Sequence, residues 1–133
     1  MTKKLKMDGF TAGVPHATNS WIVPIELAQR SFFLYRDRYV YTDTAFGELY
    51  DEHLPNTIDL INASHLITNG GFVDNRLWLD VLILDTPNGK FIQKQMDAGV
   101  KYSPVYRAIG LVGDDRVVTE FKILTFDLKA EAE

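Results

Sequence analysis

The clearest pattern of the chain is an apolar strand followed by an amphipathic helix. Residues 77–84 (LWLDVLIL) are apolar at nearly every position, which predicts a central strand covered on both faces. The next five residues (DTPNG) supply a capping hydroxyl and a proline suited to the first helical turn. Apolar residues then recur at helical spacing as far as Gly99, which stands where a left-handed cap is expected. We therefore predict a helix from about Pro87 to Ala98.

Three further segments are predicted to pair with or follow this unit. Residues 58–67 (IDLINASHLI) form a strand, and Asn69-Gly70-Gly71 predicts a turn that makes it the antiparallel neighbour of the central strand. Residues 100–110 return as an extended segment, which must be an edge or bulged strand because Pro104 has no N–H group. Residues 117–128 (VVTEFKILTFDL) predict a last long strand.

The remaining segments complete the predicted organisation. Residues 1–20 are rich in turn formers and predict an N-terminal arm, and residues 129–133 predict a charged tail. Residues 21–27 contain a proline and favour an edge strand, while the aromatic run 31–41 (SFFLYRDRYVY) favours a strand pair or one bent strand. We expect one domain over residues 21–128. Its fold class is mainly β with one or two helices, as an antiparallel β-barrel or strongly curved sheet.

The amino-acid composition excludes several kinds of functional site and partner. The 133 residues include no cysteine, which excludes disulfides, thiol catalysis and thiolate metal sites. His16, His53 and His65 lack the spacing of metal ligands, so we expect neither a metal nor another cofactor. A net charge of −4 without a basic stripe argues against nucleic acid as a partner. No apolar run approaches the ~20 residues that span a bilayer, and no signal-peptide pattern is present, so no membrane partner is expected.

Several short motifs follow one another in a distinctive order. They are GEL (47–49), a His-Leu-Pro loop (53–55), NASHLI (62–67), LDTPNGK (84–90), RAIG (107–110) and FKILTFDL (121–128). In this order and spacing they resemble the head-maturation (prohead) proteases of tailed bacteriophages. The likeness covers about residues 46–128. It implies a β-barrel serine protease fold related to the herpesvirus assemblins, found in virion head assembly.

The resemblance also implies site residues. It places His65 on the family's catalytic histidine and Arg107 on the arginine of the nucleophile strand, where it is a candidate for oxyanion support. The family's serine pair corresponds to Val105 and Tyr106. Valine has no hydroxyl, and a phenol is a poor acyl-transfer nucleophile near neutral pH. Ser103 is the nearest hydroxyl, but two residues along a strand displace a side chain by ~6–7 Å unless a bulge at the following proline shortens the distance.

Each candidate also has a structural interpretation. His65 lies on a mostly apolar strand face and would then be a satisfied, partly buried histidine. Ser103 would be a strand-end hydroxyl. Arg107 would pair with a carboxylate, for which Asp80 and two others, Asp59 and Glu120, are candidates. Asp80 would either orient His65 or occupy an exposed position of the sheet.

Two classes of function remain open, and the loss of the serine pair favours the first. It is a non-catalytic bacteriophage head (capsid) protein, a decoration, stabilising or minor component that contacts the major capsid protein or other head proteins. Such a pseudoenzyme would lie in the virion head, and in the host cytoplasm during assembly. Exposed edges in residues 21–27 and 31–41 would favour docking or self-association into a homo-oligomer.

The alternative is an active maturation protease that cleaves scaffold and capsid precursors. Ser103 would attack the scissile carbonyl, His65 would be the general base, and backbone amides near Arg107 would bind the oxyanion. A binding module with an unrelated partner is a third interpretation.

Overall fold

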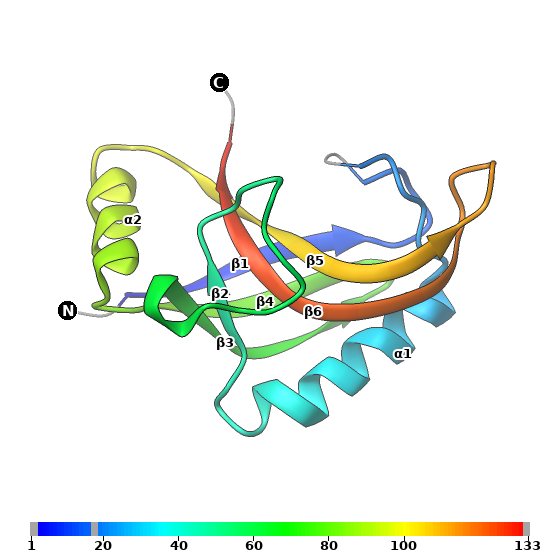
Figure 1. Ribbon diagram of the computed structural model, residues 1–133, viewed down its shortest axis with the longest axis horizontal. Coiled ribbons are helices and arrows are strands. Elements are labelled where there is room, and N and C mark those ends of the chain that lie inside the picture. The colour runs from blue at the N-terminus through cyan, green and yellow to red at the C-terminus, as the bar shows by residue number, and fades with distance from the viewer. Residues whose placement is uncertain (1–2, 17–18, 132–133) are drawn as a thin grey trace.

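The computed structural model describes residues 3–16 and 19–131, which form two antiparallel sheets and two α-helices (Figure 1). A four-stranded sheet has the order β1-β4-β3-β2, and β5 pairs with β6 in a second sheet. The strands are β1 (Lys3–Thr11), β2 (Phe46–Glu48), β3 (Ala63–Val73), β4 (Arg76–Ile83), β5 (Tyr102–Val112) and β6 (Val118–Ala130). The helices are α1 (Ile25–Tyr35), its π-helical continuation η1 (Arg36–Val40), the short 3-10 helix η2 (Leu60–Asn62) and α2 (Pro87–Asp97). The predicted mainly β fold is confirmed, as curved sheets and not as a closed barrel.

The predicted strand–helix unit is confirmed as β4 and α2. β4 lies between β1 and β3, and Leu77 and the three alternate residues after it on one face are fully buried. The opposite face is only half-buried, so the strand is covered well on one side. The hydroxyl of Thr86 accepts a 3.1 Å hydrogen bond from the Gly89 N–H at the start of α2. Gly99 ends the helix with a φ of +95°.

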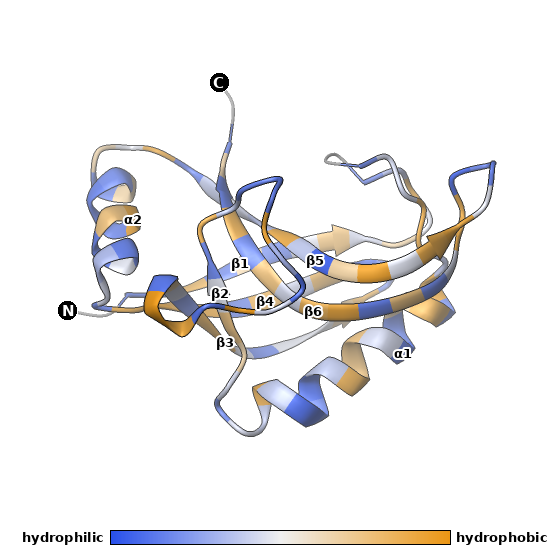
Figure 2. Cartoon of the chain, viewed as in Figure 1, coloured by the Kyte–Doolittle hydropathy of each residue, from blue (hydrophilic) through white to orange (hydrophobic). Residues whose placement is uncertain are grey.

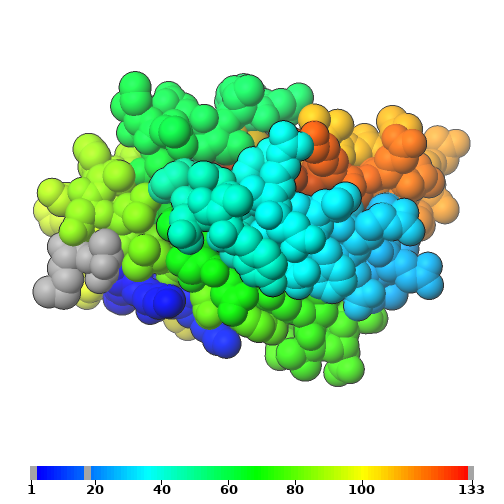
Figure 3. Space-filling model, turned by 90° about the horizontal axis from the view of Figure 1, so that it is seen from below, coloured from blue at the N-terminus to red at the C-terminus, as the bar shows by residue number. Residues whose placement is uncertain are grey.

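The predicted strands over residues 21–27 and 31–41 are wrong, because most of this region is α1 and η1. Their aromatic residues have high β propensity, but their burial follows a helical period. The buried side chains of α1 recur at spacings of three and four: Ala28, Ser31, Phe32 and Tyr35. Pro24 stands at the N-cap, where a missing N–H costs no helical hydrogen bond. Seen from below, α1 and η1 (cyan) cover this face beside the β3–β4 hairpin (green) (Figure 3).

The turn predicted at residues 69–71 is also wrong, although the antiparallel pairing of β3 with β4 is confirmed. β3 continues to Val73, and the chain turns at Asp74, which has a φ of +54°. The glycines serve packing instead. A Cβ atom on Gly70 would lie 2.6 Å from the Phe32 ring, so the absence of a side chain lets α1 approach the sheet.

Among the described residues near each end of the chain, more belong to strands than predicted. The N-terminal arm contains β1, which pairs with β4 with Leu5 opposite Val81. Leu5 and Met7 are half-buried and alternate with exposed residues, as in a strand, but the lysines around them made this pattern difficult to recognise in the sequence. The predicted arm also includes residues 1–2 and 17–18, which lie outside the described residues. Of the predicted tail, Lys129 and Ala130 belong to β6, and residues 132–133 lie outside the described part.

The two sheets meet along a seam between β2 and β6. The Tyr50 N–H donates a 2.8 Å hydrogen bond to the Leu128 carbonyl, and Leu49 forms a parallel bridge with Leu128. After β2 the chain makes a long loop that ends at η2, where Leu60 and Ile61 are 63% and 85% exposed and form the orange turn of Figure 2. This seam and its loop carry most of the motif residues.

Candidate functional site

Three of the sequence motifs meet in one buried ion cluster. Glu48 comes from GEL on β2, Arg107 from RAIG on β5 and Asp127 from FDL on β6. Arg107 binds Asp127 through two parallel hydrogen bonds, Nε to Oδ2 at 2.9 Å and Nη2 to Oδ1 at 2.6 Å. Nη2 also donates to Glu48 Oε2 at 3.0 Å. The three side chains are 9%, 6% and 3% exposed for Arg107, Glu48 and Asp127, so the cluster is shielded from water.

The remaining donors of Arg107 hold the loop between β2 and β3. Nη1 donates to the carbonyls of Pro55 and Thr57, at 3.1 and 3.0 Å. All five N–H groups of the guanidinium are therefore used. Burial lowers the pKa of Arg107, but the hydrogen bonds and charges of Asp127 and Glu48 outweigh it and raise that pKa above its usual value. Arg107 is thus a fixed cation that ties a loop to two strands.

The partners that the sequence suggested for Arg107 are wrong. Its carboxylate partners are Glu48 and Asp127, not those named above (Asp59, Asp80 and Glu120). The half-buried carboxylate of Asp80 instead lies 3.8 Å from the exposed Lys6. The β4 residue opposite His65 is Ile83, three residues after Asp80. The side chains of Asp80 and His65 are therefore separated along the sheet, and Asp80 does not orient His65.

His65 is fully buried and uses both ring nitrogens. Nε2 lies 2.6 Å from the Phe126 carbonyl oxygen, and Nδ1 lies 2.7 Å from the Ser64 hydroxyl. Because a carbonyl only accepts, Nε2 carries the proton and Nδ1 of the neutral ring accepts from Ser64. Burial, reinforced by the charge of Arg107, lowers the pKa of His65 to about 4 against the opposing effect of the Phe126 hydrogen bond. The ring is neutral at pH 7.

Gly47 closes the space next to this histidine. It lies opposite His65 in the β2–β3 pair. A Cβ atom at this position would lie 2.3 Å from His65 Nε2 and 2.2 Å from the Phe126 oxygen. The glycine of GEL is therefore required for the close approach of three chain segments. There is no room for a substrate at Nε2.

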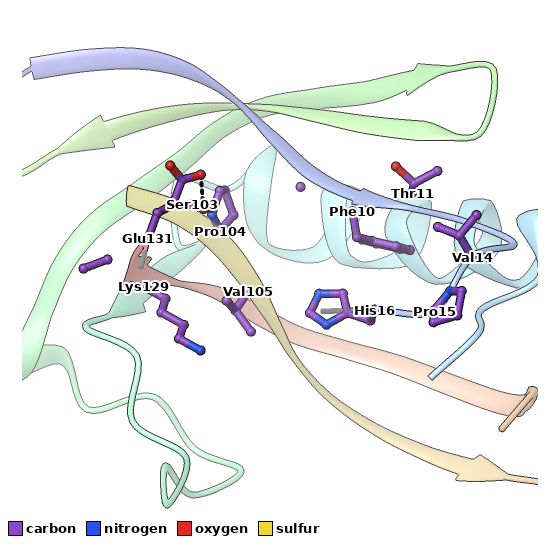
Figure 4. A pocket seen from close by; sticks show the side chains of 12 residues that line it. Phe10, Thr11, Val14, Pro15, His16, Ser103, Pro104, Val105, Lys129 and Glu131 are labelled. Carbon is purple, nitrogen blue, oxygen red and sulfur yellow. Dashed lines mark hydrogen bonds between the residues drawn. The ribbon is translucent and has the colours of Figure 1, made fainter. Parts of the chain in front are cut away.

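Ser103 lies elsewhere on β5. Its hydroxyl donates a 2.8 Å hydrogen bond to Glu131 Oε1, drawn as a dashed line in Figure 4. In the β5–β6 ladder Ser103 is opposite Lys129, whereas Phe126, which binds His65, is opposite Tyr106. Three residues along a strand correspond to about 10 Å. The structure therefore brings His65 and Arg107 to one seam and leaves Ser103 outside it.

The residues that the resemblance places at the nucleophile positions are part of the core. Val105 is 8% exposed and Tyr106 is 6% exposed. The Tyr106 ring packs edge-on against Phe10 and Phe121, with centroids 5.3 and 5.0 Å away. Burial raises the pKa of Tyr106 to about 12, although a hydrogen bond from its hydroxyl to Asn19 opposes the shift. The phenol stays protonated at pH 7. The ladder is irregular between Arg107 and Ala108, so the bulge considered at Pro104 is wrong.

A hollow of about 340 Å³ lies beside these two positions. It is bounded by the loop after β2, by β5 and by Asn19, Trp21 and Asp127. None of the described residues that line it is a serine, threonine, cysteine or histidine. The hollow therefore offers neither a strong nucleophile nor a histidine base.

Sequence reasoning missed the roles of Glu48, Asp127 and Ser64. Glu48 and Asp127 belong to two of the sequence motifs, GEL and FKILTFDL. The spacing of residues along the strands does not show that both carboxylates bind the same arginine. Ser64 is a hydroxyl bound to His65, yet both residues have no exposed surface, so an outside molecule does not reach them. Within residues 3–16 and 19–131, no group of three or more acidic, histidine or cysteine side chains is placed to hold a metal ion. None of the helices in these same ranges is both long enough and apolar enough to span a membrane.

Comparison with known proteins adds one likeness of fold. No protein-family model and no curated protein matches the sequence. Among solved structures, the chain is similar to the bacteriophage T4 capsid assembly protease, gp21. The TM-score is 0.79 and the identity is 17%, over 96% of this chain and 98% of that chain. The fold of this chain therefore resembles that of a phage capsid assembly protease.

Proposed function

We propose that this chain is a non-catalytic bacteriophage head protein built on a prohead-protease-like fold. The observation that carries the proposal is the closed environment of His65, whose two ring nitrogens bind Phe126 and Ser64 inside the protein. A general base must reach both a nucleophile and a substrate proton. A buried histidine with both nitrogens engaged and a pKa of about 4 does neither near pH 7.

The replaced serine pair supports the same proposal. Val105 and Tyr106 fill the core, and the nearest hydroxyl on that strand, Ser103, binds Glu131. Arg107 has committed all its donors to Asp127, Glu48 and the loop, so its side chain is not available to an oxyanion. In this proposal the resembling motifs persist because they build the fold.

A head protein needs a surface for its neighbours, and the most exposed apolar side chains of the described residues include ones on α1, next to η1 and on η2. Leu34 on α1 and Tyr41, directly after η1, are 66% and 64% exposed, and Ile61 on η2 is 85% exposed. We assign the chain to the virion head, in contact with the major capsid protein or another head protein, as a decoration, stabilising or minor component. Assembly would begin in the host cytoplasm.

The test is mass spectrometry of purified mature particles from the phage that encodes this chain. The proposal predicts intact chain in these particles, together with cross-links from residues near Ile61 or Leu34 to another head protein. Particles that lack the chain, while immature heads contain it, would favour the alternative of a maturation protease that leaves after its work. An Ile61→Ser variant tests whether incorporation depends on η2, with the exposed Leu111→Ser as a matched control on β5.

A further inference from the structure

The two sheets are hydrogen-bonded to each other on one side, whereas on the other side they pack together, as at Phe10 and Tyr106, without strand pairing. β2 and β6 are linked by the Tyr50–Leu128 hydrogen bond and by the His65–Phe126 contact. On the opposite side β1 and β5 are both edge strands that do not pair with each other. In Figure 4, Phe10 of β1 and His16 lie on one side of the pocket between these strands, and Ser103 and Glu131 lie on the other.

The free edge of β5 turns backbone groups into this space. The carbonyls of Leu128 and Phe126 point away from β5, since they bind Tyr50 and His65. Residues directly opposite each other in an antiparallel ladder direct their backbone groups alike, either toward each other or outward. Pro104, opposite Leu128, therefore directs its carbonyl outward, toward β1. Pro104 has no N–H group, and the position of that group would also face outward, so the β5–β6 pair loses no backbone hydrogen bond.

Two hollows follow this edge and share Ser103, Pro104 and Glu131. One measures about 660 Å³ and reaches residues 9–16, and the other measures about 440 Å³ and reaches residues 3–8. We call the combined space the edge groove. It runs along β1 on one side and the start of β5 on the other, so its length suits an extended chain of about eight residues at the rise of a strand.

The edge groove is positively charged in a chain whose net charge is −4. Its lining has four lysines against two carboxylates, which leaves a net charge of +2: Lys3, Lys6, Lys101 and Lys129, with Asp8 and Glu131. His16 adds no charge at pH 7, because burial first and the charge of Lys129 second lower its pKa to about 4. The pairs of Lys3 with Asp97 and of Lys6 with Asp80 are long, at 3.8 Å, and both lysine side chains are exposed to solvent, although Asp80 is half-buried.

We propose that the edge groove binds an extended, acidic peptide segment of another protein by strand addition. The segment pairs with the outward backbone groups of Tyr102 and Pro104, and its carboxylates lie near Lys101 and Lys129. Its alternate apolar side chains contact Phe10 and Val105. The proposal goes beyond the proposed function, because it holds whether the partner is a head protein or any other chain.

The probe is a fluorescein-labelled peptide of about eight alternating valine and glutamate residues, long enough to follow the groove. Fluorescence anisotropy should show saturable binding below about 1 mM. The valine–lysine counterpart and an acidic peptide with a central proline should bind much more weakly. Amide shifts in NMR spectra should map to β1 and to residues 101–103.

The charge test uses two double variants. Lys101→Glu with Lys129→Glu should weaken binding by about tenfold or more, whereas the control Lys94→Glu with Lys122→Glu, on α2 and on β6 outside the groove, should change it little. Equal weakening by both variants, equal binding of acidic and basic peptides, or no binding would overturn the proposal. A stable dimer in light scattering that excludes the peptide would do so too, by placing a second copy in the groove. None of these results bears on the presence of the chain in virions.

Discussion

The Nε2–H of His65 donates a 2.6 Å hydrogen bond to the Phe126 carbonyl and so joins β3 to β6. In a serine protease this ring nitrogen faces the nucleophile. Here it joins the two sheets, and Gly47 leaves just enough room for the contact. The position that the resemblance marks as catalytic is therefore the position that holds the seam together.

Replacing His65 should lower stability. His65→Ala leaves a cavity and removes the partner of both the buried Phe126 carbonyl and the Ser64 hydroxyl, which should cost about 2–5 kcal/mol of unfolding free energy. Urea denaturation followed by circular dichroism measures the loss. The exposed His53→Ala is the matched control and should stay within about 0.5 kcal/mol of the parent. An unchanged midpoint for His65→Ala would contradict the structural role.

Adding a side chain at Gly47 should also lower stability. A Cβ atom in Gly47→Ala meets both the Phe126 oxygen and the His65 ring at less than 2.5 Å, so the seam must open, at a cost of about 1–3 kcal/mol or more. Removing the histidine in a Gly47→Ala/His65→Ala variant should not restore stability, because the clash with the Phe126 carbonyl remains. Full recovery in the double variant would show that the ring alone needs the glycine.

Arg107 should be critical for stability through the charges that it neutralises. Arg107→Met leaves two buried carboxylates without a cation and should cost about 3–5 kcal/mol, whereas Arg38→Met on the exposed face of η1 should cost little. Adding Asp127→Asn to Arg107→Met should recover part of the loss, since one uncompensated charge disappears. If the two changes were simply additive, Arg107 and Asp127 would not act as a pair.

Stability should fall in mild acid. The pKa of His65 is about 4 in the folded chain, and that of His16 is also about 4, against about 6.5 for an unfolded histidine. The unfolded chain therefore binds more protons between these values, and stability that is complete above pH 6.5 declines as the pH falls toward 4. Urea midpoints measured from pH 7.5 to 5 should decrease, and a His16→Gln/His65→Gln variant should flatten the slope. An unchanged slope in that variant would assign the effect to carboxylates.

The sequence predicted the elements that local chemistry specifies. The Thr86-Pro87 start and the Gly99 end placed α2, and the apolar alternation placed β4. The prediction from sequence failed where tertiary packing decides the structure. The aromatic residues of α1 are helical because Phe32 and Tyr35 pack on the sheet. Gly70 lies within a strand, not a turn, and its missing side chain leaves room for the Phe32 ring. The ion cluster was beyond prediction for a related reason. Glu48 and Arg107 are 59 residues apart, and no local pattern states that they meet.

The proposed lack of serine peptidase activity can be measured with a fluorophosphonate probe, which labels activated serines. Intact-mass and peptide spectrometry of the wild-type chain at pH 7.5 should show no adduct, under conditions in which chymotrypsin is fully labelled. The same result is expected for Tyr106→Ser, because the new hydroxyl would still lack an available base. An adduct on Ser103 or Ser64 of the wild-type chain that His65→Ala abolishes would establish a working Ser–His pair and overturn the proposal of a non-catalytic protein.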